Sequence, residues 1–184
     1  TPTALSEEQH TVRELVFVDA DTPDYQTLVD DLLGNSSDDR LIEVILLDNN
    51  TDGIAQLTDT LSEHRDLDAV HIISHGSEGA IDLGGTQLEF DTLLANTTSI
   101  QGWANAFSEN GDLLIYGCNL TASADGQALV DSLARLTGAD VAASNDLTGS
   151  LDKGGDWELE YQTGQVETAV IGDDVLLGDW TGTL

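Results

Sequence analysis

Apolar and polar residues alternate along the chain in blocks that predict strands and helices in turn. Near-continuous apolar runs, typical of strands buried on both faces, occur at residues 14–19, 41–48, 68–75, 111–119 and 139–146. Between them lie segments with helical spacing of apolar residues, at 22–34, 53–64, 99–108 and 121–138. The first of these begins with Thr22 and Pro23 and ends at Gly34, which are typical helix boundary residues. The pattern predicts an α/β domain with a doubly wound, mainly parallel sheet and helices on both faces.

Two segments depart from this alternation. Residues 79–90, "GAIDLGGTQLEF", contain two short runs around Gly84 and Gly85, which predict an inserted β-hairpin near residues 80–90. Near the end, "DWELEY" and "QVETAVI" flank Thr163 and Gly164, and we expect them to form an antiparallel C-terminal strand pair. We therefore divide the chain into an N-terminal extension at 1–12, one domain at 13–172 and a C-terminal tail or linker at 173–184.

The composition narrows the classes of partner. Asp and Glu number 35 against five Lys and Arg, which gives a formal net charge of -30 and leaves no basic patch to neutralise phosphates. Nucleic acids and anionic membranes are therefore excluded as favoured partners, and we expect surroundings in which salt or divalent cations screen the charge. The apolar runs fall far short of the roughly 20 residues that span a bilayer. The chain starts at Thr1 without a leader, so we expect a mature form or an excised domain.

Two residues with catalytic potential end two of the predicted strands. His75 closes the apolar run "AVHIISH" and Cys118 closes "DLLIYGC", and a right-handed crossover can make these strands neighbours at one edge of the sheet. A thiol with its ordinary pKa of roughly 8.5 is a weak nucleophile that a nearby imidazole activates. Gly76 and Gly117 adjoin the pair, and the amides of Gly76 and Cys118 could form an oxyanion hole.

The strings "HIISHG" and "LLIYGC" resemble the caspase-like cysteine peptidases, which include caspases, gingipains, separases, legumains and the autoprocessing domains of bacterial toxins. More narrowly, "FVDADTPDYQTLVDDL", "VHIISHGSEGAIDLGG", "IYGCNLTASADGQALVDSLARLTGADVAAS" and "GGDWELE" resemble a caspase-like domain of unknown function. That domain lies near the N-terminus of very large bacterial surface proteins with cadherin-like or calcium-binding repeats. The similarity runs from about residue 14 to 170.

This resemblance implies a function and a location. His75 would be the general base and acid, Cys118 the nucleophile that forms an acyl-enzyme, and the amides of Gly76 and Cys118 the oxyanion donors. The expected activity is that of a cysteine endopeptidase on a secreted or bacterial cell-surface protein, with a peptide segment of its own parent chain or of another protein as substrate. No cofactor is required, and calcium is an optional ligand.

A non-catalytic interpretation competes with this one. A strand-end histidine is often held by a loop, and a free cysteine is most often a small buried apolar residue. The domain could then serve an adhesin as a structural or interaction module. Because side chains alternate along a strand, His71 lies on the same face as His75. It could bind a metal together with Cys118, but a histidine inside a strand is more often a satisfied core residue.

The segment "DNNTDGIAQLTD" matches the spacing of a calcium loop. Asp48, Asn50 and Asp52 would supply oxygen ligands, with Asp59 standing where a bidentate glutamate is expected. The alternative is a strand-to-helix turn in which Asp52 caps the amides of the following helix.

Ser144, Asn145 and Asp146 end the strand that follows the cysteine-bearing one. We expect them to line a substrate pocket beside Cys118, where Asp146 would pair with a basic side chain of the substrate. A simple turn is the alternative, because Ser, Asn and Asp are frequent turn residues.

Overall fold

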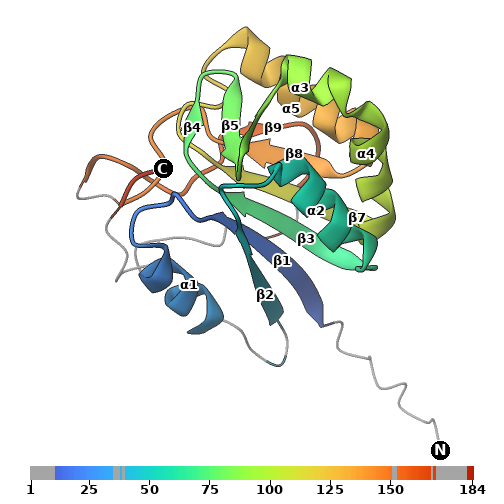
Figure 1. The fold of residues 1–184 in the computed structure, drawn as a ribbon, viewed down its shortest axis with the longest axis horizontal. Coiled ribbons are helices and arrows are strands. Elements are labelled where there is room, and N and C mark those ends of the chain that lie inside the picture. The colour runs from blue at the N-terminus through green and yellow to red at the C-terminus, as the bar shows by residue number, and fades with distance from the viewer. Residues whose placement is uncertain (1–10, 35–37, 39, 151–152, 167, 169–181) are drawn as a thin grey trace, which may run out of the picture.

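The chain folds around one mainly parallel sheet. The computed structural model describes residues 11–34, 38, 40–150, 153–166, 168 and 182–184. The sheet has six strands in the order β2-β1-β3-β7-β8-β9, all pairing in parallel except β9, which is antiparallel to β8 (Figure 1). Its strands are β1 (Val12–Asp19), β2 (Arg40–Leu47), β3 (Leu67–Ile73), β7 (Phe107–Tyr116), β8 (Asp140–Ala143) and β9 (Tyr161–Gln162). The mixed α/β fold expected from the sequence is confirmed at this level.

Helices cover both faces of the sheet unequally. Residues of α1 (Tyr25–Gly34) pack in one buried apolar cluster with Val16, Ile73 and Cys118. The opposite cluster holds residues from all the other helices: α2 (Gly53–Ser62), α3 (Phe90–Ala95), α4 (Thr97–Gly102), the 3₁₀ turn η1 (Trp103–Ala106) and α5 (Ala124–Thr137). Each of these elements contributes apolar side chains to one of the two clusters. Figure 1 shows α1 apart from the other helices. None of the helices in the described part of the chain is long and apolar enough to cross a membrane.

Local sequence signals explain where α5 begins and ends. The Ser123 hydroxyl accepts the amide of Gly126 at 3.3 Å, as an N-cap residue does. At the other end Gly138 takes the left-handed conformation with φ 69°, which a residue without a Cβ adopts at little cost. These two caps fix α5 between Cys118 and β8.

The hairpin expected near residues 80–90 forms and is part of a second, smaller sheet. β5 (Ala80–Leu83) and β6 (Thr86–Glu89) pair in antiparallel fashion across Gly84 and Gly85, and Gly84 has φ 57°. The two-residue β4 (Gly76–Ser77), which the sequence did not reveal, pairs with β5. This small sheet begins directly after His75 and therefore lies at the carboxyl end of β3.

Two sequence-based expectations need correction. The helix expected at 99–108 stops at Ala106, because Phe107 already pairs with Leu67 across a register shift and starts β7. Within the described residues, the end of "DWELEY" forms β9 and pairs with β8 rather than with the following run, and the Thr163 amide and hydroxyl bond the backbone of Val141. Of that following run, the described Gln165 and Val166 lie in no strand, and most of its remainder lies outside the described residues, as does most of the expected tail at 173–184.

Candidate active site at the ends of β3 and β7

The parallel pairing of β3 and β7 brings His75 and Cys118 to the same end of the sheet. Ile73 lies opposite Tyr116 in the last pair of this register, and His75 and Cys118 each follow two residues later. The Ser74 amide donates to the Tyr116 carbonyl at 3.2 Å, so the pairing continues beyond β3. Cys118 packs in the apolar cluster on the sheet face covered by α1.

Gly76 sits directly against the cysteine loop. A Cβ on this residue would lie 2.6 Å from the Gly117 carbonyl carbon and 2.8 Å from both the amide nitrogen and the carbonyl oxygen of Cys118, so only glycine permits this approach. The Asp82 amide donates to the His75 carbonyl at 3.0 Å, which makes Gly76 and Ile81 the adjacent non-bonded pair of the antiparallel ladder. The Gly76 amide therefore points away from β5.

The Cys118 thiol is shielded. Its residue is 4% exposed, its sulfur accepts the Thr148 amide at 3.3 Å, and its S–H donates to the Thr148 carbonyl at 3.6 Å. Burial raises the pKa of the Cys118 thiol. Hydrogen bonds from the backbone of Thr148 and Leu184 lower this pKa, but burial is the larger effect. The thiol is therefore protonated and enclosed in this conformation.

His75 is partly exposed beside it. Within the described part of the chain its ring forms no hydrogen bond, in contrast to the loop-held histidine of the non-catalytic interpretation. Imidazole and thiol thus follow strands that end at the same edge of the sheet, and no hydrogen bond joins them.

The loop 144–146 lies against the chain that follows Cys118. The Asn119 amide donates to the Asp146 carbonyl at 2.8 Å, and the Thr121 amide donates to the Ser144 carbonyl at 3.0 Å. Ser144 is fully buried and its hydroxyl bonds Asp146, whereas Asn145 and Asp146 are exposed. The three predicted pocket residues are therefore next to the cysteine loop, and only two of them face solvent.

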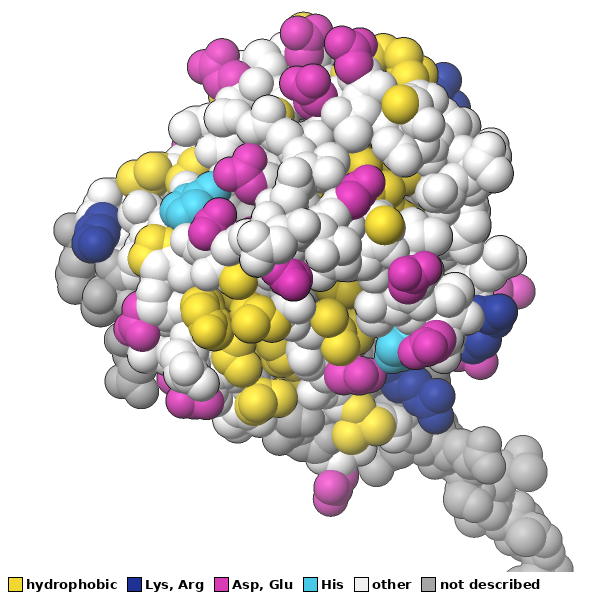
Figure 2. Space-filling model, viewed as in Figure 1, with side chains coloured by type: hydrophobic (Ala, Val, Ile, Leu, Met, Phe, Trp, Pro, Cys, Tyr) yellow, Lys and Arg dark blue, Asp and Glu magenta, His cyan; other side chains and the backbone are white. Residues whose placement is uncertain are grey.

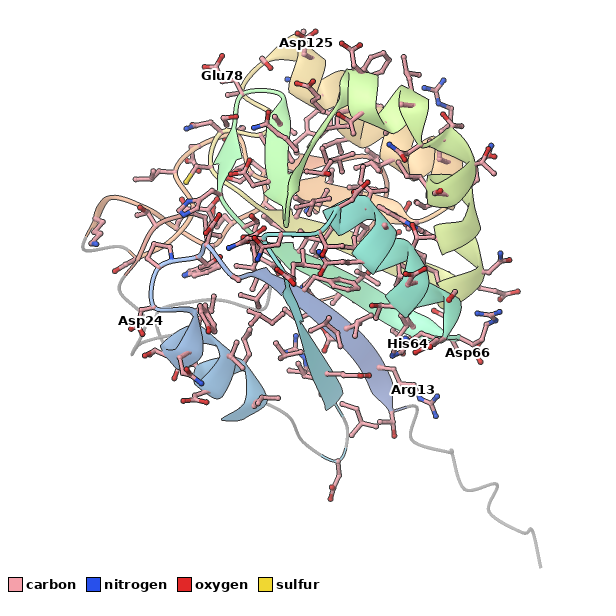
Figure 3. The ribbon with its side chains drawn as sticks, viewed as in Figure 1. Arg13, Asp24, His64, Asp66, Glu78 and Asp125 are labelled. Carbon is pink, nitrogen blue, oxygen red and sulfur yellow. The ribbon has the colours of Figure 1, made fainter. Side chains whose placement is uncertain are left out.

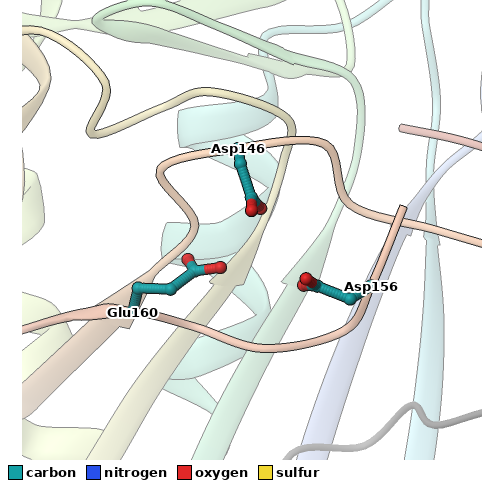
Figure 4. A group of neighbouring side chains, drawn as sticks. All are labelled: Asp146, Asp156 and Glu160. Atoms are coloured by element: carbon teal, nitrogen blue, oxygen red, sulfur yellow. The ribbon is translucent and has the colours of Figure 1, made fainter. Parts of the chain in front are cut away.

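Two further carboxylates join Asp146. Carboxylate oxygens of Asp146, Asp156 and Glu160 lie within 4.8 Å of one another, and Figure 4 shows the three side chains pointing toward one another. Burial and the neighbouring charge of Asp146 raise the pKa of Glu160, whose carboxylate also accepts the Asn145 amide at 3.0 Å. Sequence reasoning missed Asp156 and Glu160, although acidic residues alternate in "DWELE" and could have marked this strip.

The residues of the calcium-loop motif already have amide partners. Asp52 is the N-cap of α2 and accepts the amides of Ile54 at 2.8 Å and Ala55 at 3.4 Å. The Asp48 carboxylate accepts the amide of Asn50 at 2.8 Å. The cap given as the alternative is present, and calcium binding by Asp48, Asn50 and Asp52 stays a prediction.

His71 belongs to a buried polar chain that crosses four strands. Its Nε2 donates to Glu14 at 2.8 Å, and its Nδ1 accepts from the Tyr116 hydroxyl at 3.1 Å, because a carboxylate can only accept. Arg40 binds the other side of Glu14 with two nitrogens. Burial alone would raise the pKa of Glu14, but the hydrogen bonds from His71 and Arg40 outweigh it and lower that pKa to about 2. Burial lowers the pKa of His71, so this neutral histidine is a satisfied core residue.

A cavity of about 220 Å³ opens between the small sheet and the starts of α3 and α5. Its lining includes Glu78, Glu89, Asp91 and Asp125. Acidic side chains gather at the top of the view in Figure 2, where Figure 3 places Glu78 and Asp125. This recess does not include His75 or Cys118.

Comparison with known proteins yields a family but no activity. No curated protein matches the chain. Among solved structures, one described as a small-chain dehydrogenase is similar over 69% of this chain and 78% of its own, with 12% identity and a TM-score of 0.41, which is too low to bear on function. A family model described as "Domain of unknown function (DUF4347)" matches residues 15–184. The chain therefore belongs to the DUF4347 family of domains of unknown function.

Proposed function

We propose that this domain is a latent cysteine endopeptidase of the caspase-like type, with His75 and Cys118 as its catalytic pair. The observation that carries the proposal is the parallel pairing of β3 and β7 up to Ile73 and Tyr116, because His75 and Cys118 each lie two residues beyond this pair. The close approach of Gly76 to Cys118 adds support, because it brings two backbone amides to the same place. A doubly wound caspase-like topology and a place on a large bacterial surface protein are parts of the same proposal.

The reaction would begin with transfer of the Cys118 proton to His75. The thiolate attacks the carbonyl carbon of a peptide bond, and the amides of Gly76 and Cys118 bind the developing oxyanion. His75 then gives its proton to the leaving amine as the carbon–nitrogen bond breaks. Water, deprotonated by His75, hydrolyses the thioester and regenerates the thiol.

Asp146 is our candidate for substrate selection. Its carboxylate is exposed beside the cysteine loop, and Asp156 and Glu160 add negative charge there. Such a surface favours a substrate with a lysine or arginine side chain near the scissile bond. The carboxylates could also attract calcium, and calcium therefore belongs in the assay as a variable.

The second candidate function is that of an inactive structural or interaction module. The raised pKa and burial of Cys118 favour it, since a catalytic thiol needs thiolate character and access. The two candidates differ in whether a conformation exists in which the thiol opens to substrate.

Turnover assays separate the two. Casein and fluorogenic peptides with arginine or alanine before the scissile bond are incubated with the wild type, Cys118→Ala and His75→Ala, with and without calcium. A matched control is His64→Ala, because His64 lies on the surface in contact with Glu43. We expect cleavage by the wild type and His64→Ala and none by the other two variants, with all four equally folded by circular dichroism. Cleavage that survives loss of Cys118 would contradict the proposal.

A further inference from the structure

A short stretch near the end of the sequence pairs with the loop that encloses Cys118. The Ser150 amide donates to the Gly182 carbonyl at 2.9 Å, and the Leu184 amide donates to the Thr148 carbonyl at 3.0 Å. Between these two bonds, Gly149 and Thr183 form an antiparallel bridge. Residues 182–184, the 182–184 segment, thus add an extended strand to residues 148–150, the 148–150 edge.

This pairing reaches the sulfur directly. The Thr148 carbonyl that accepts the Leu184 amide also accepts the Cys118 S–H. The Leu184 side chain is 6% exposed and packs in the same apolar cluster as Cys118. The segment is therefore one of the elements that keep Cys118 from solvent.

The 148–150 edge has the form of a backbone-recognition edge. Its other side is occupied within the fold, because the Gly149 amide bonds the Asp156 carbonyl at 2.9 Å and the Asp156 amide bonds the Leu147 carbonyl at 3.0 Å. Gly149 has φ 140°, and a Cβ there would lie 2.5 Å from the Gly182 carbonyl oxygen. Because Gly149 has no side chain, the backbone of the segment can approach the backbone of the edge closely. A bare strand edge binds an extended peptide through its main chain.

We propose that the 148–150 edge is a binding site for an extended peptide in antiparallel orientation, and that the 182–184 segment occupies it in cis and closes the site over Cys118. Gly182 and Thr183 are only partly buried, and two hydrogen bonds join the segment to the edge, so a competing peptide can replace it. This inference rests on the proposed peptidase function, because the edge would hold the substrate beside Cys118. The 182–184 segment would then be what keeps the Cys118 thiol shielded and unreactive.

The test compares two neighbouring proline substitutions in the full chain. Leu184→Pro removes the amide that bonds Thr148. Thr183→Pro is the matched control, because the flanking bonds direct the Thr183 amide away from the edge. Alkylation of Cys118 by iodoacetamide reports access. We expect Leu184→Pro to react at least tenfold faster than wild type, because loss of one net hydrogen bond gives about tenfold in open population and loss of the buried Leu184 side chain adds to it. Thr183→Pro should react about as slowly as wild type.

A peptide added in trans tests the binding site itself. The heptapeptide GDWTGTL, which repeats the last seven residues of the sequence, should slow alkylation of Leu184→Pro toward the wild-type rate, and GDWTGTP should not. Equal alkylation of Leu184→Pro and wild type, or no protection by the peptide, would overturn the inference. Loss of cooperative unfolding in Leu184→Pro would also overturn it, because the segment would then be an integral part of the core.

These outcomes are independent of turnover. Iodoacetamide reacts with an accessible Cys118 whether or not His75 assists catalysis. Faster alkylation of Leu184→Pro, in a protein that cleaves no substrate, would support the peptide-binding edge and contradict the peptidase function. Cys118-dependent cleavage with unchanged alkylation would support the peptidase function and contradict the peptide-binding edge.

Discussion

Replacing Glu14 by glutamine should cost about 3 kcal/mol of unfolding free energy at pH 7. The side chain is fully buried, and its contacts with His71 and Arg40 lower its pKa from 4.5 to about 2. At about 1.4 kcal/mol per pKa unit, a lowering of this size corresponds to about 3 kcal/mol of stabilisation by the ionised form. Because the folded-state pKa is depressed, this contribution is complete above pH 4.5 and is lost as the pH falls toward 2.

Urea unfolding of wild type and Glu14→Gln between pH 7 and pH 2.5 measures this contribution as a difference. Protonation of the other carboxylates relieves charge repulsion equally in both proteins, so this effect cancels when the two unfolding free energies are subtracted. Glu43→Gln is the control, since Glu43 is 59% exposed where it meets His64 and its surface pair should contribute less than about 1 kcal/mol. A Glu14→Gln difference that is below 1 kcal/mol at pH 7, or that stays constant down to pH 2.5, would refute the assignment of Glu14 as a buried, charged centre.

Three further predictions concern stability and are read from thermal or urea unfolding. Gly76→Ala should destabilise the domain by about 1–3 kcal/mol, because its Cβ would meet the backbone of the cysteine loop. Gly102→Ala is the control: a Cβ there has nothing within 4 Å, so the change should be neutral or stabilising. Equal effects of the two changes would contradict the close approach of Gly76 to Cys118. Asp52→Ala should cost about 1 kcal/mol through loss of the α2 cap, and no change in the urea midpoint would exclude that role. Asp146→Asn should raise the melting temperature at pH 7 in low salt, because Asp146 helps to raise the pKa of Glu160 and the ionised pair opposes folding above the ordinary value of 4.5. This gain should shrink in high salt, and a lowered melting temperature would contradict it.

The sequence was sufficient to predict features that depend on local pattern. Apolar runs located all five parallel strands, and paired glycines located the hairpin at Gly84 and Gly85. The position of Cys118 after its strand also followed from the pattern, because strand ends are visible where apolar runs stop. That His75 and Cys118 act together in one site stays a prediction.

Features that depend on contacts between distant segments could not be predicted. Nothing local indicates that Thr148 and Leu184 enclose the Cys118 sulfur, since 30 or more residues separate them from it. Glu160 joins Asp146 only because β9 folds back on β8, a pairing that the sequence pattern did not indicate. Sequence patterns thus identified the candidate side chains, whereas their access and charge environment are set by loops and by residues 182–184.

The polar chain from Arg40 through Glu14 and His71 to Tyr116 also bears on how the sheet selects its alignment. Its four members come from β2, β1, β3 and β7 in that order, one from each neighbouring strand. Strands made of Val, Ile and Leu bury similar surfaces after a shift of two residues, so apolar burial distinguishes poorly between such alignments. A shift of any one strand would leave a buried carboxylate, guanidinium or imidazole without its partner, at a cost of several kcal/mol. This polar network therefore selects one alignment of the four strands, and the same alignment brings together the ends of β3 and β7, which His75 and Cys118 follow.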